Sequence, residues 1–93
     1  MARQKFASVW EALEDTAVEA ANMRARSELM IAMRSKIEGW QVSQTEAARR
    51  LGLTQPRLND LMRGKIGKFS LDALMNLAGR AGLTVRLKIG KAA

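Results

Sequence analysis

Residues 43–64 read SQTEAARRLGLTQPRLNDLMRG, and several residues in this segment have the types and spacing of helix caps. Ser43–Glu46 has the spacing of a capping box, in which a hydroxyl and a carboxylate satisfy free amide hydrogens at the start of a helix. Gly52 stands where a left-handed residue ends a helix. Thr54 can cap the next helix, whose first turn tolerates Pro56 because an amide hydrogen has no helical partner there. The stretch therefore predicts two short helices joined by a tight turn.

Two capped helices around a glycine turn are typical of a helix-turn-helix, in which the first helix supports the second in the major groove of DNA. The formal net charge of +7 favours a polyanionic partner. Residues 49–68 contain six basic residues and one acid, Asp60, whereas residues 11–19 contain four acids and no base. Because the positive charge lies on and just after the motif, DNA binding is favoured over a purely structural helical hairpin.

The rest of the chain predicts a single, mostly α-helical domain over residues 1–93, with about five helices and one C-terminal strand. Around the helix-turn-helix at 43–64, helices are expected over residues 16–39 and 70–81, and a strand over residues 83–89. A capping box at Thr16–Glu19 predicts the start of the long helix, and Gly39 predicts its end. Apolar residues at helical spacing in residues 1–15 predict one or two loose helical turns before it.

The end of the chain predicts a homodimer. Residues 83–89 alternate between apolar and polar side chains, as a half-buried strand does. A single strand has unpaired edges, so it must pair within the chain or with a second copy. The predicted dimer interface consists of Leu83, Val85, Leu87 and Ile89. Pairing with residues 4–10 of the same chain is the alternative, and it would leave dimerisation to contacts between helices.

The composition argues against several other functions. Cysteine and histidine are both absent, which removes the residues used most often in disulfide, thiolate and metal sites. No metal or cofactor is therefore expected, and because carboxylate pairs such as Glu14 and Asp15 lack a partner for acid–base work, no enzyme is predicted. The longest apolar run, Leu29–Met33, is far too short to span a bilayer, so no membrane partner is expected. Residues 1–5 lack the apolar segment of a signal peptide, which favours a cytoplasmic protein.

The motif resembles that of the phage-repressor and Cro-like (XRE) helix-turn-helix family. The matching residues, all in register, are Gln44, Ala48, Gly52, Thr54, Gln55 and Gly64. The resemblance implies a lambda-repressor-like fold and a repressor that binds a double-stranded DNA operator as a dimer. RNA binding is a weaker alternative, since the sequence does not predict exposed aromatic pairs on a sheet.

Other segments resemble one branch of that family, which contains HigA-like antitoxins and small regulators. These segments are residues 6–13, 20–30, 54–66 and 69–72. The resemblance implies an antitoxin that represses its own toxin-antitoxin operon. Residues 8–22 combine Trp10 and Leu13 with four acids, and such a surface could cover a basic ribonuclease toxin. The alternatives for the whole protein are a module that mainly neutralises the toxin and a regulator without a toxin. For residues 8–22, the alternative is a solvated cap over the core.

The second motif helix has its apolar residues on one face and its polar residues on the opposite face and at its N-terminal tip. The resemblance implies that its first turn and a half reads bases, and the candidates are Gln55, Pro56, Arg57, Asn59 and Asp60. Gln and Asn can pair with adenine and Arg with guanine, whereas Pro can touch a thymine methyl and Asp can accept from cytosine. Asp60 could instead orient Arg57 or Arg63. Arg57 and Asn59 could also be merely solvated.

Phosphate contacts position a protein on DNA without specifying a sequence. The candidates are Ser43, Gln44, Thr54, Arg63, Lys65 and Lys68. For the two lysines, a solvated surface is the alternative.

Overall fold

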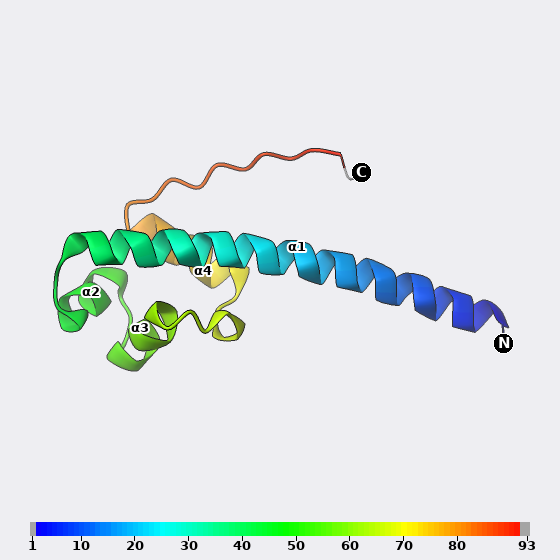
Figure 1. The fold of residues 1–93 in the computed structure, drawn as a ribbon, viewed down its shortest axis with the longest axis horizontal. Helices are drawn as coiled ribbons and strands as arrows, with labels where there is room; N and C mark the ends of the chain where they lie inside the picture. Colours follow the sequence, from blue (N-terminus) through cyan, green and yellow to red (C-terminus); the bar gives the residue numbers. More distant parts are fainter. Residues whose placement is uncertain (1, 92–93) are drawn as a thin grey trace.

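A computed structural model describes the backbone of residues 2–91 and the side chains of residues 16–91. Over these residues the α-helices are α1 (Ala2–Trp40), α2 (Gln44–Leu51), α3 (Gln55–Met62) and α4 (Leu71–Arg80), with a 3-10 turn, η1 (Ile66–Lys68), before α4. Helix α1 runs the length of the molecule, and the short helices pack against its C-terminal half (Figure 1). The prediction of a mostly helical fold built on a helix-turn-helix is confirmed.

The beginning of α1 differs from the prediction. The helix is continuous from Ala2, so the expected start at Thr16 was wrong. Residues 2–38 contain neither proline nor glycine and are rich in strong helix formers, so nothing interrupts the helix before the capping pattern. The one or two helical turns expected in residues 1–15 are part of α1, which begins at residue 2. The described chain therefore has four α-helices rather than about five.

The end of α1 also lies beyond the predicted one. The helix continues through Gly39 to Trp40. Gln41 then adopts a left-handed conformation, with φ of 51°, and its N–H donates to the carbonyl of Glu38 at 3.2 Å. Gln41 thus takes the role that was expected of the glycine.

The helix-turn-helix forms as its capping residues predict. The hydroxyls of Ser43 and Thr54 accept from the backbone N–H groups of Glu46 and Arg57, at 3.1 and 3.3 Å. Gly52 follows α2 with φ of 68°, a conformation that strains every residue with a Cβ. These local signals fix where α2 ends and where α3 begins.

The core lies where α1, α2, α3 and α4 meet. Its buried residues are Met30, Met33, Ile37, Ala47, Ala48, Leu51, Leu58, Leu61, Phe69, Leu74, Leu77, Ala78 and Ala81. Each of the four helices contributes, so the core fixes the orientation of α3 relative to α1 and α2. None of the helices in the described part of the chain could span a lipid bilayer.

The strand predicted over residues 83–89 was wrong for the single chain. The segment is extended but pairs with no strand in the part of the chain that the structure describes. The alternative partner, residues 4–10, lies inside α1, where its backbone groups are used by the helix. The first two apolar residues of the segment are half-buried against the core, whereas Leu87 and Ile89 are 79% and 91% exposed.

The turn at Gly52 yields a stability prediction. A Cβ at this position would meet Nη1 of Arg80, which donates to the carbonyl of Leu51 at 3.2 Å. We expect Gly52→Ala to lower the free energy of unfolding by about 1–3 kcal/mol, because the left-handed backbone becomes strained and Arg80 must move. Urea denaturation followed by circular dichroism measures this change.

Two further variants control this experiment. In an Arg80→Ala background the added Cβ no longer meets the guanidinium. Gly52→Ala should therefore lower the free energy of unfolding by less there than in the parent. Gly39 is helical and has nothing within 4 Å of an added Cβ, so Gly39→Ala should be neutral or stabilising. Equal effects of the two glycine substitutions in the parent would contradict this account of the turn.

Candidate nucleic-acid interface

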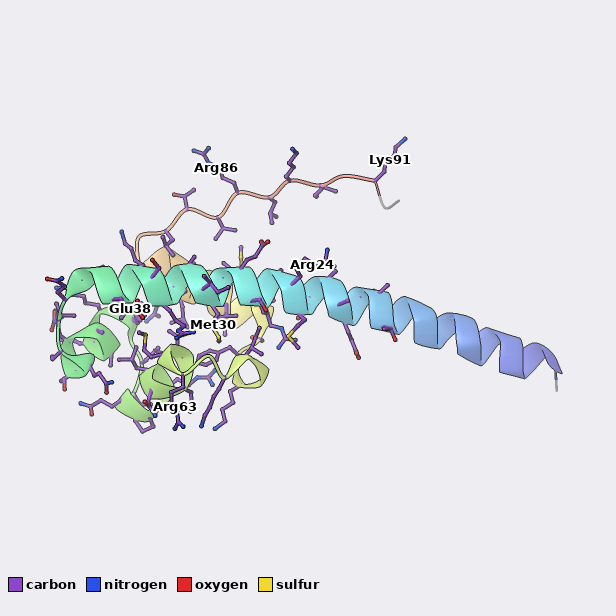
Figure 2. The ribbon with its side chains drawn as sticks, viewed as in Figure 1. Arg24, Met30, Glu38, Arg63, Arg86 and Lys91 are labelled. Atoms are coloured by element: carbon purple, nitrogen blue, oxygen red, sulfur yellow. The ribbon has the colours of Figure 1, made fainter. Side chains whose placement is uncertain are left out.

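Helix α3 has one buried face and one exposed polar face. Leu58 and Leu61 are 1% and 0% exposed, and they anchor the helix in the core. The exposed residues of α3 and its C-cap are Gln55, Pro56, Asn59 and Arg63. Figure 2 shows Arg63 on the side of the molecule that faces away from α1. The structure thus brings these four predicted contact residues together on one accessible surface.

The N-terminal tips of α2 and α3 are joined by a side-chain hydrogen bond. Nε2 of Gln55 donates to Oγ1 of Thr45 at 2.6 Å. This bond uses one of the two amide hydrogens and leaves the other, together with the carbonyl oxygen, for a further partner. The sequence analysis missed Thr45, although its place in the first turn of α2, beside Gln44, was an available signal.

Arg57 does not project from the tip of α3 as the sequence predicted. Its Nη1 donates to the carbonyl of Lys68 at 2.5 Å, and its guanidinium carbon lies 3.8 Å from the centroid of the Phe69 ring. Phe69 itself is buried, with 1% exposure. The guanidinium therefore stacks on the edge of the core and ties α3 to η1. Nothing local in the sequence signals this contact, because the partners are more than ten residues apart.

Asp60 lies between two lysines on the flank of α3. Its two carboxylate oxygens are each 3.5 Å from an ammonium nitrogen, one of Lys65 and the other of Lys68. Partial burial raises the pKa of this carboxyl, but the positive charges of Lys68 and Lys65 outweigh it, so the pKa is lowered overall. Asp60 is therefore ionised at neutral pH. Its ion pairs are with these lysines, and not with Arg57 or Arg63.

A second carboxylate on the motif is also shared by two bases. Glu46 accepts two hydrogen bonds from Arg49, at 2.8 and 2.6 Å, and one from Arg50, at 3.1 Å. Hydrogen bonds from Arg49 and then Arg50 lower the pKa of Glu46 to about 2. The guanidinium of Arg50 also lies 5.1 Å above the ring of Trp40, so one of the two arginines packs on a neighbour. Glu46 and Asp60 each cancel one of the two positive charges beside them. The motif therefore keeps a net positive charge, but a smaller one than its basic residues alone would give.

A groove lies elsewhere on the molecule, between α1, α4 and the C-terminal segment. It has a volume of about 450 Å³ and an apolar lining that includes Leu29, Ala32, Leu71, Met75, Leu83 and Val85. Figure 1 shows the C-terminal segment on the opposite side of α1 from α2 and α3. The groove is therefore separate from the exposed face of α3.

Comparisons with known proteins agree with this geometry. The model of a family described as a helix-turn-helix domain matches residues 12–90, a range that includes α2, α3 and α4. The chain is also similar to a solved structure assigned to the XRE family of transcriptional regulators. That likeness has a TM-score of 0.72 and 31% sequence identity, and it covers 80% of this chain and 83% of the other. No curated protein matches the sequence.

Proposed function

The chain belongs to the helix-turn-helix family of XRE-like, DNA-binding transcriptional regulators, and we propose that it is a dimeric, sequence-specific repressor. The observation that carries the proposal is the exposed polar face of α3, opposite its buried leucines. A helix of eight residues is about 12 Å long, and the major groove is about 12 Å wide. The exposed face of α3 can therefore enter the groove while its leucines stay in the core.

Base reading is assigned mainly to Gln55 and Asn59. These residues are one helical turn apart, so they lie on the same ridge of α3, with about 5–6 Å between their Cβ atoms. Each carboxamide can pair with an adenine. The bond to Thr45 supports this role for Gln55, because it orients the amide and leaves one N–H and the carbonyl oxygen for the base. Pro56, beside them, can add contact with a thymine methyl.

Arg57 and Asp60 are weaker candidates for base reading. To reach a guanine, Arg57 would have to leave both the Phe69 ring and the carbonyl of Lys68. Asp60 would have to leave its two lysines before it could accept from a cytosine. We therefore assign Arg57 to positioning η1, and we expect the bases under α3 to be mainly A·T pairs.

Phosphate contacts are assigned to the two ends of the motif. Ser43, Gln44 and Thr54 lie at the N-termini of α2 and α3, where backbone N–H groups and the helix dipole favour an anion. Arg63, Lys65 and Lys68 lie at the other end of α3 and in the loop that follows. Phosphates on both sides of the major groove would hold α3 in register.

The groove beside α4 supports a homodimer interface. Its lining is apolar, and the neighbouring Leu87 and Ile89 are exposed in the single chain. We assign the dimer interface to the C-terminal segment, with Leu83, Val85, Leu87 and Ile89 packing between two copies. A two-fold dimer formed there would leave both α3 helices free to enter half-sites about one helical turn apart.

An antitoxin role is the second candidate. The part of α1 before the core projects from the body of the molecule (Figure 1), and its described residues include Val18 and Met23, which are 67% and 42% exposed. The acids of residues 11–19 give this end of α1 the opposite charge to a basic ribonuclease toxin. The side chains of residues 8–15, which the sequence analysis included in this surface, lie outside the described residues.

The proposed base contacts can be tested by fluorescence anisotropy on duplexes selected from genomic DNA. We expect Gln55→Ala and Asn59→Ala each to weaken specific binding by about 1–3 kcal/mol and to relax the preference at one base pair. Lys65→Ala should weaken binding to every sequence and reduce the slope of log affinity against log salt by about one. Arg57→Ala should behave like the lysine variant, since its role is positioning. If all four variants bind like the parent at matched salt, this docking of α3 is wrong.

The dimer interface can be tested by sedimentation. Removing residues 83–93 should give monomers with greatly weakened operator binding, because both half-sites must be held by one dimer. The double variant Leu87→Ser and Ile89→Ser should do the same without exposing the monomer core, since both residues are already exposed. Lys88→Ser is the matched control and should leave the dimer intact. A truncated protein that still sediments as a dimer would exclude this interface.

The antitoxin role can be tested by co-expression with the product of the adjacent gene. The parent should co-purify with that product and restore growth, because the acidic end of α1 covers a basic surface. A variant lacking residues 2–22 should lose both effects while keeping the helix-turn-helix. Absence of both effects with the parent would remove the antitoxin role and leave DNA binding unaffected.

A further inference from the structure

We propose that Asp60 is a built-in competitor for DNA phosphate. In the free protein its carboxylate occupies the anion site formed by Lys65 and Lys68, and on binding the DNA backbone takes its place. This inference rests on the proposed function, which assigns both lysines to phosphate contacts. Asp60, a residue of α3 itself, thereby limits how strongly the two lysines bind DNA.

The geometry of the cluster supports this competition. A carboxylate and a phosphate both present anionic oxygens to the same ammonium donors. Each oxygen of Asp60 is 3.5 Å from one lysine nitrogen, which is longer than the roughly 2.7–2.9 Å of a strong charge-assisted hydrogen bond. The side chains of Lys65 and Lys68 are 41% and 56% exposed, compared with 19% for Asp60. The lysines are therefore loosely held and accessible, so an incoming phosphate can replace the carboxylate.

The lysines do not need the carboxylate to keep their positions. The backbone N–H of Lys65 donates to the carbonyl of Asp60 at 3.0 Å, and the N–H of Lys68 donates to the carbonyl of Lys65 at 3.0 Å. Arg57 donates a side-chain hydrogen bond to the carbonyl of Lys68. These bonds remain when the carboxylate becomes an amide. The main effect of Asp60 on DNA binding is therefore its charge.

Electrostatics give the direction of the effect. The pKa of Asp60 is lowered, so the competing charge is present throughout the neutral range. Asp60→Asn removes one negative charge beside two phosphate-binding cations and keeps the shape of the side chain. Affinity for DNA of any sequence should then rise, by about threefold or more at 0.1 M salt, because a repulsive charge beside the bound phosphates is removed and salt screens only part of its effect. The slope of log affinity against log salt should steepen by up to about one.

The experiment measures the fluorescence anisotropy of a labelled random-sequence DNA duplex titrated with the full chain, at salt concentrations from about 50 to about 250 mM. Glu19→Gln is the matched control, since Glu19 is an exposed acid on the part of α1 that precedes the core and its substitution makes the same change in charge. Thermal melts confirm that each variant is folded. We expect tighter binding and a steeper slope for Asp60→Asn, and a clearly smaller change for the control.

A second set of variants isolates the lysines. In a background of Lys65→Ala and Lys68→Ala, Asp60→Asn should lose most of its effect, because the site for which the carboxylate competes is gone. Equal effects of Asp60→Asn and Glu19→Gln in the parent, or weaker binding by Asp60→Asn, would overturn the inference and leave the proposed function standing. A parent that binds no DNA at the lowest salt would overturn both.

Discussion

Leu58 and Leu61 are almost completely removed from solvent, and their burial is the constraint on which the function of α3 depends. A helix of eight residues is unstable on its own in water, because too few hydrogen bonds offset the cost of starting it. Packing against the core supplies the missing stability and decides which face of α3 remains outside. Gln55, Asn59 and Arg63 are exposed because the leucines between them are buried.

The charge of the motif is moderated by its own acids. Glu46 binds two arginines on α2, and Asp60 lies between two lysines beside α3. Phosphate contacts strengthen binding to all sequences equally, so an unopposed basic surface raises affinity without raising selectivity. With each carboxylate cancelling part of the charge, more of the discrimination between sequences would fall to the proposed polar contacts with bases. Net charge alone therefore overstates how strongly this surface attracts DNA.

The features that the sequence predicted well are those set by neighbouring residues. Ser43, Thr54 and Gly52 act within one helical turn, so the ends of α2 and α3 could be located from their types and spacing. The start of α1 was missed because the capping pattern at Thr16 also fits the interior of a longer helix when no proline or glycine precedes it. A cap shows that a helix can begin at a residue and does not show that it must.

The features that the sequence could not predict depend on contacts between distant segments. Arg57 has the residue type and position of a base reader, and only the fold brings Phe69 beneath its guanidinium. Asp60 was expected to accept from a cytosine or to orient an arginine at position 57 or 63, whereas its ion pairs in the structure are with Lys65 and Lys68. The C-terminal segment alternates like a strand, yet a strand also requires a partner, which one chain does not provide among the described residues.

Helix α1 connects the two surfaces to which partners are assigned. Arg26, on α1, donates to the carbonyls of Ile66 and Phe69, at 3.2 and 3.4 Å, and so ties α1 to η1 and the residue after it. One turn on, Leu29 lines the apolar groove assigned to the dimer. A second copy packed in that groove would restrain the same helix that holds the lysine-bearing loop. The proposed dimer contact and the proposed phosphate contacts would thus share one rigid support, and each α3 would be held at a fixed distance from the two-fold axis of such a dimer.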